Sequence, residues 1–248
     1  MIFNCVIGIW VTAALILGQC MPAADNLRTT PIAFFHVPMA ITMLLGFMLA
    51  AWYGVLWLVK RQERYDALSL GFAEAGLAAG VVAMATGMIF SKTNWGAYWS
   101  WDPQQVGVLG TLLTYVALFS LRGATEDEEK RRNFWAVYAI IGVMVAVFGS
   151  YVFRQILPPN SSLHPSGTLT TSQPIFRLAL WFNVFGFAML MIKLGLLRAR
   201  FEVVAQKLRR LEHREFPAPL VTLMKTPLAD GGSVPLAIAG PGTGSGAE

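Results

Sequence analysis

The segment Trp95-Gly-Ala-Tyr-Trp-Ser-Trp-Asp-Pro103 joins two long apolar runs and is the feature around which the rest of the chain is arranged. Three tryptophans and a tyrosine lie within seven residues. Exposed rings of this size promote aggregation unless something covers them. An aromatic belt at a membrane interface also enriches Trp and Tyr, but it spreads them over many helix ends. Rings concentrated in one connection instead favour the binding of a flat apolar ligand.

Composition places the chain in the membrane class. Of its 248 residues, 55% are hydrophobic and only 13% are charged, whereas soluble domains are about 25% charged. A bilayer-spanning helix needs about 20 apolar residues. Apolar runs of this kind cover residues 1–21, 34–59, 67–90, 106–121, 134–157 and 175–197. We therefore predict an all-α, polytopic membrane protein with six transmembrane helices.

The distribution of basic residues predicts the orientation of these spans. The connections after the second and fourth runs, together with residues 198–214, carry thirteen Lys and Arg residues, against four on the opposite side. Cytoplasmic segments of membrane proteins carry the excess of Lys and Arg. Both termini are therefore expected in the cytoplasm, and the aromatic segment is expected on the outer face of the membrane.

The predicted domain organisation has three parts. Residues 1–200 form a six-helix transmembrane domain, and residues 201–215 form a cytoplasmic amphipathic segment with apolar side chains at helical spacing. Residues 216–248 are rich in Pro, Gly and small residues, which is typical of a disordered tail.

Several function classes are disfavoured. The net charge of +5 is not gathered on one soluble face, so nucleic-acid binding is not expected. Cys5 and Cys20 lie on one predicted helix, too far apart to bridge, and no Cys-x-x-Cys motif is present for redox chemistry or covalent haem attachment. A transporter would place polar groups near the midplane, and Glu74 is the one acidic residue predicted inside a span. We expect Glu74 to pair with another helix or to snorkel.

Two of the three histidines are predicted on the same face as the aromatic segment. His36 begins the second span, and His164 lies between the fifth and sixth spans. His213, in the basic cytoplasmic segment, is expected to be solvated. Haem iron accepts imidazole as an axial ligand, and indole rings stack on flat apolar surfaces. The arrangement favours a haem site, although a histidine at a helix end can also serve as an interfacial hydrogen-bonding group.

Asp102-Pro103 also has a local structural interpretation. Asp is a preferred N-cap residue and Pro is favoured at the first helical position. Gln105 stands at the third helical position, where the partner residue of a capping box is found. We therefore predict that a helix starts here, which leaves open a second role for Asp102 in positioning the aromatic residues.

Trp95–Pro103 resembles the tryptophan-rich WWD signature of the haem-handling membrane proteins of cytochrome c biogenesis. Phe35-His-Val-Pro38 resembles the HVP segment of the CcmC branch, and His164 occupies the place of that branch's second histidine. The resemblance covers roughly residues 1–200. It implies that haem b is held non-covalently at the periplasmic face, with His36 and His164 as axial iron ligands. Five residues would form the platform for haem and for chaperone docking: Trp95, Tyr98, Trp99, Trp101 and Asp102.

The same resemblance implies partners and an alternative. In the CcmC branch, haem passes without enzymatic turnover to the membrane-tethered periplasmic chaperone CcmE, assisted by ABC-type transporter subunits and the small membrane protein CcmD. The exact sequence of the aromatic segment resembles the CcsA (ResC) branch more closely, and that branch delivers haem directly to a synthase partner. That branch usually has more spans and further histidines within them, whereas spans three to six contain none here. The CcmC-type interpretation is therefore preferred.

Overall fold

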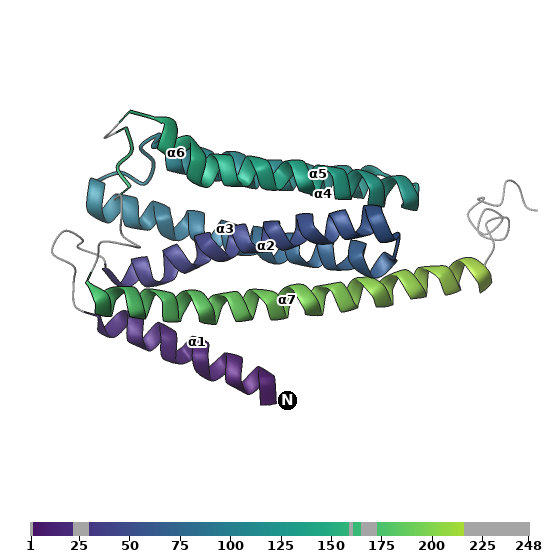
Figure 1. Ribbon diagram of the computed structural model, residues 1–248, viewed down its shortest axis with the longest axis horizontal. Coiled ribbons are helices and arrows are strands. Elements are labelled where there is room, and N and C mark those ends of the chain that lie inside the picture. The colour runs from purple at the N-terminus through teal and green to yellow at the C-terminus, as the bar shows by residue number, and fades with distance from the viewer. Residues whose placement is uncertain (1, 22–29, 159–160, 165–172, 216–248) are drawn as a thin grey trace, which may run out of the picture. The chain divides into compact units, whose positions relative to one another are not determined.

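The computed structural model describes residues 2–21, 30–158, 161–164 and 173–215, and all regular secondary structure in these residues is helical (Figure 1). The elements are α1 (Ile2–Cys20), α2 (Thr30–Lys60), α3 (Glu63–Trp95), α4 (Pro103–Ala124), α5 (Glu128–Val147), the π-helix η1 (Phe148–Val152), α6 (Phe153–Ile156) and α7 (Pro174–Glu215). Within the described part, six helices are long and apolar enough to cross a membrane. The predicted all-α class and six spans are thus confirmed.

The helices extend several residues beyond the apolar runs at the ends that carry the most basic residues, because buried ion pairs accommodate the charges there. Asp66 is fully buried and receives two hydrogen bonds from Arg122 of α4, at 2.8 and 2.7 Å. Arg132 of α5 bonds Glu63 at 2.9 Å and Glu128 at 3.0 Å. Buried charges persist only when they are paired in this way, and these pairs tie α3, α4 and α5 together.

Small residues allow the helices to approach closely along their length. A Cβ atom placed on Gly46 of α2 would lie 2.7 Å from the Gly76 Cα of α3, and one on Gly107 of α4 would meet the backbone of Gly149. Close approach through small residues is the usual way in which helices pack in a bilayer. Gly149 belongs to the π-helix η1, which continues the fifth span. In the same π-helix the Ser150 carbonyl accepts from Gln104 Nε2 of α4 at 2.6 Å.

The last span differs from the prediction in its length. Residues 201–215 continue α7 without a break after the predicted end of the span at residue 197. Residues up to Val204 form one compact unit, which contains every contact described below. Glu74 pairs with Arg198 of α7, with Nε and Oε2 2.6 Å apart, so the expected pairing between helices is confirmed. The predicted tail, 216–248, lies outside the described residues.

Candidate functional site

His36, His164 and the aromatic segment 95–103 lie at one end of the helices. The start of α2, the end of α3 and the start of α4 meet there (Figure 1), and residues 161–164 pack against the start of α4. Asp66 and its arginine partners lie at the other end of these helices. The fold therefore brings His36 and His164, which are more than 120 residues apart in the sequence, to the same end of the helices.

His36 lies against α3 in a defined orientation. Its Nδ1 is 2.9 Å from the Ala83 carbonyl oxygen, and Thr86 Oγ1 lies 3.4 Å from the same nitrogen. Glycine at position 87 makes room for the ring, since a Cβ there would be 2.7 Å from the His36 Cε1. A carbonyl can only accept, so Nδ1 carries the proton and the lone pair of a neutral ring is at Nε2.

His164 is held by a carboxylate instead. Its Nδ1 lies 3.0 Å from Asp102 Oδ1, and its ring is 5.4 Å from the Trp95 ring, centroid to centroid. In the neutral imidazole this contact also places the proton on Nδ1 and the lone pair on Nε2. The hydrogen bond between a histidine and a carboxylate is the usual second-shell support of a metal-binding imidazole.

Asp102 connects the helix start to the loop that carries His164. It caps α4 by accepting from the Gln104 amide at 2.8 Å, as the sequence predicts, with Pro103 at the first helical position. The same carboxylate accepts from the Leu163 amide at 2.5 Å and from the Ser162 hydroxyl at 2.9 Å. One buried side chain therefore serves both as the cap of α4 and as the anchor of residues 162–164.

These contacts determine the ionisation of Asp102. Burial disfavours its charged form, but hydrogen bonds from His164 and from the Leu163 and Gln104 amides outweigh that effect. Together they hold the pKa of Asp102 well below its usual range. Asp102 is thus a carboxylate at neutral pH, ready to stabilise a proton on Nδ1 of His164.

The aromatic residues differ in their ring contacts and exposure. Trp95 packs inward between Phe90 and His164, whereas Trp99 and Trp101 meet edge to face with centroids 5.6 Å apart. Trp101 is 76% exposed and has a left-handed backbone with φ of 57°. That backbone is rare for a bulky residue, and such strain concentrates at functional sites. Tyr98 is also exposed and lies beneath the Lys92 ammonium group.

Gln105 organises the aromatic segment in a way that the sequence did not predict. Its Oε1 accepts from the backbone amide and hydroxyl of Ser100, at 3.0 and 3.2 Å, and its Nε2 donates to the Tyr98 carbonyl. In the predicted capping box Gln105 would bond the Asp102 amide. That part of the prediction is wrong, because Gln105 bonds Ser100 and Tyr98. The residue instead folds the preceding loop back onto α4.

The potential metal-binding groups at this end of the helices are the two imidazoles. Among the described residues, no group of three or more His, Cys, Asp or Glu side chains could hold a metal ion. Each of the two imidazoles has an anchored Nδ1 and therefore leaves Nε2 as the nitrogen that could bind a metal. The indole rings beside them offer flat apolar contact. The residues that position the His36 imidazole, Ala83, Thr86 and Gly87, carry no local sequence signal, since each acts across the contact between α2 and α3.

Comparison with known proteins gives a consistent result. The family model "CcmC: Heme exporter protein C" matches residues 2–214. Heme exporter protein C of Rhodobacter capsulatus is 27% identical over 222 residues, which are 83% of this chain and 90% of that protein. The protein of the same name from Paracoccus denitrificans is 26% identical over 192 residues, 75% of this chain and 78% of its own. Cytochrome c biogenesis protein CcsA of a Synechococcus strain is 29% identical over 91 residues, 37% of this chain and 30% of that protein.

Proposed function

Because the chain belongs to the heme exporter protein C family, we propose that it binds haem b non-covalently and passes it to a periplasmic haem chaperone during cytochrome c maturation. The role is non-enzymatic: the chain holds, orients and releases a ligand. Haem is the cargo, and its iron and porphyrin are the groups that the protein must recognise.

The pair of anchored imidazoles carries this proposal. His36 and His164 come from separate parts of the chain, on α2 and on the loop that packs against the start of α4, and lie at the same end of the helices. Each has its Nδ1 directed at a protein acceptor, Ala83 or Asp102. In this proposal both histidines hold the iron axially through Nε2, and Asp102 positions His164.

The aromatic residues have two roles in the proposal. Trp95 contacts His164 and lines the inner side of the site, while the exposed Tyr98 and Trp101 present apolar surface outward, with Trp99 against Trp101. The outer rings supply the platform for haem and for the receiving chaperone, which is expected to be CcmE-like. Hydrophobic surface of this kind is otherwise rare outside a bilayer core.

The orientation and partners complete the proposal. The excess of Lys and Arg at the end opposite His36 favours a haem site on the periplasmic side of the inner membrane, with cytoplasmic termini. Assembly with ABC-type transporter subunits and a small CcmD-like membrane protein follows from the family. Residues 1–200 would form the haem-handling domain, with the helical segment 201–215 and the tail extending into the cytoplasm.

A second candidate is direct delivery of haem to a cytochrome c synthase, as in the CcsA branch. The matching stretch of the Synechococcus CcsA protein favours it, but that match covers 37% of the chain. Copurification with a tagged chain separates the two: a CcmE-like chaperone supports the first, and a synthase partner supports the second.

The haem site itself is tested by absorption spectroscopy on the purified full-length protein. We expect a Soret band that is weakened or shifted in His36→Ala and in His164→Ala. His213→Ala is the matched control, since it removes the one remaining histidine, and should leave the band unchanged. Spectra that are identical to wild type in both single variants would exclude the axial assignment.

A further inference from the structure

The end of α3 carries a cation beside the aromatic segment. Lys92 is exposed and lies in the last turn of that helix. Its Nζ donates to the Gly96 carbonyl at 2.9 Å and lies 5.7 Å from the centroid of the Tyr98 ring. Trp95, which precedes Gly96, packs against the His164 ring. The Lys92 ammonium group is therefore held at the edge of the proposed haem platform.

The contacts of Lys92 do not neutralise its charge. A carbonyl oxygen and an aromatic ring attract an ammonium group, but neither carries a full negative charge. In the part of the chain that the structure describes, Lys92 makes no ion pair. Asp102 is the acidic side chain described at this end of the helices, and it is occupied by His164 and the Leu163 amide. Because an ammonium group has three N–H donors, Lys92 can bind a carboxylate and keep its bond to Gly96.

Haem brings carboxylates to this end of the helices. Its propionate groups project from the rim of the porphyrin, away from the iron, so a cation that binds them must lie to the side of the axial ligands. Lys92 has this placement, because it contacts Gly96 and Tyr98 rather than either imidazole. Basic residues are also scarce at this end, with four in the sequence against thirteen at the other. Membrane topology therefore does not explain a lysine here.

We propose that Lys92 binds a propionate carboxylate of haem and so fixes the rotation of the porphyrin. The inference rests on the proposed function, because it requires haem to be held by His36 and His164. Two axial ligands define an axis through the iron but leave the porphyrin free to turn about it. A charge-assisted hydrogen bond from the ammonium group to the rim removes that freedom. The Tyr98 ring beneath Lys92 helps to keep the ammonium group in place.

The test compares haem with haem dimethyl ester, in which the propionate charges are removed and the iron is unchanged. Each porphyrin is titrated into the purified full-length protein and followed by the Soret band. We expect wild type to bind haem more tightly than the ester. Lys92→Gln should lower the affinity for haem about fivefold, the upper end for an exposed ion pair, and leave the affinity for the ester unchanged. Lys92→Arg keeps the charge and should retain the preference for haem.

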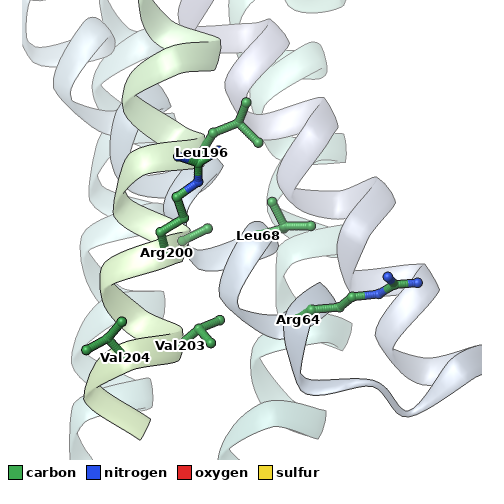
Figure 2. Close-up of a pocket in the computed structure, with 7 residues that line it drawn as sticks. Arg64, Leu68, Leu196, Arg200, Val203 and Val204 are labelled. Carbon is green, nitrogen blue, oxygen red and sulfur yellow. The ribbon is translucent and has the colours of Figure 1, made fainter. Parts of the chain in front are cut away.

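Lys60→Gln is the matched control. Lys60 is also an exposed lysine in the last turn of its helix, α2, and its Nζ also lies 5.7 Å from the centroid of a tyrosine ring, that of Tyr65. This pair lies at the end of the helices opposite the histidines. Arg64, which lies over the same ring, is seen in Figure 2 beside the pocket between α3 and α7. We expect Lys60→Gln to bind both porphyrins as wild type does.

The two porphyrins separate a role in binding propionate from a role in the fold. An equal loss of affinity for haem and for the ester in Lys92→Gln would overturn the proposal, because Lys92 would then only support the C-terminus of α3. A preference for haem that is unchanged in Lys92→Gln would also overturn it, while leaving the proposed function intact. A wild-type protein that gives no Soret band with either porphyrin would refute the proposed function and this inference with it.

Discussion

Asp102→Asn isolates the electrostatic support of His164 from the start of α4. Asparagine is as good an N-cap as aspartate, so the bond from the Gln104 amide can be kept. The charge is lost, however: Oδ1 accepts from both the Gln104 amide and His164 Nδ1, so the asparagine oxygen can offer His164 only a neutral acceptor. The new NH2 group also cannot accept from the Leu163 amide as Oδ2 does. A hydrogen bond to a charged group contributes about 1.5–3 kcal/mol. Because His164 is only half-buried and water can replace part of the contact, we take about 2 kcal/mol, or about thirtyfold in haem retention.

The assay is transfer of haem from the purified protein to an excess of apomyoglobin, followed by the Soret band. Asp127→Asn is the matched control, because Asp127 caps α5 through the Lys130 amide and has no contact with the histidines. We expect haem to leave the Asp102 variant about thirtyfold faster than wild type, with the control unchanged. Equal rates for the two variants would refute the role of Asp102 in positioning His164.

The pH dependence of the same pair of proteins gives an independent check. The pKa of Asp102 is lowered by folding, so its contribution to stability is complete above the ordinary value of 3.8 and declines as the pH falls through the lowered folded-state pKa. The difference in unfolding temperature between wild type and Asp102→Asn should therefore persist from about pH 8 to about pH 5 and shrink below about pH 4. A difference that vanishes by pH 6 would contradict the assignment.

Two further substitutions test the fold around the site. Gly87→Ala adds a Cβ 2.7 Å from the His36 Cε1 and should displace the imidazole, giving a shifted Soret band, whereas Gly110→Ala adds a methyl in open space and should leave the spectrum unchanged. An unshifted band in Gly87→Ala would show that His36 does not hold iron. Asp66→Asn leaves Arg122 buried without its counter-charge and should destabilise the protein by about 3–5 kcal/mol in thermal unfolding. A loss below about 1 kcal/mol would mean that water reaches this pair.

The parts of the structure that were predictable are those encoded by local patterns. Apolar runs predict the spans, and Asp102-Pro103 predicts the start of α4 because capping depends only on neighbouring residues. The true helix ends were missed near Asp66, where hydropathy alone suggests a connection. The burial of that carboxylate depends on Arg122, which is 56 residues away.

The contacts that orient the histidines were not predictable for the same reason. Nothing near His36 in sequence indicates that its ring will lie on Gly87, and nothing near His164 indicates Asp102 as its acceptor. Gln105 illustrates the limit of a local motif. Its position fits a capping box, but the loop before Asp102 turns so that Ser100 lies within reach of the amide.

The two imidazoles have unequal supports, and this inequality bears on release. His36 donates to a neutral carbonyl, whereas His164 donates to a carboxylate that stays ionised at neutral pH. A carboxylate acceptor raises the basicity of the ring more than a carbonyl does. Under the proposed function, His164 is therefore the stronger iron ligand and His36 the weaker one. A protein that must pass on its ligand gains from one iron–ligand bond that breaks easily. In this fold the weaker bond would be that of His36 on α2, and the stronger bond that of His164 on the loop.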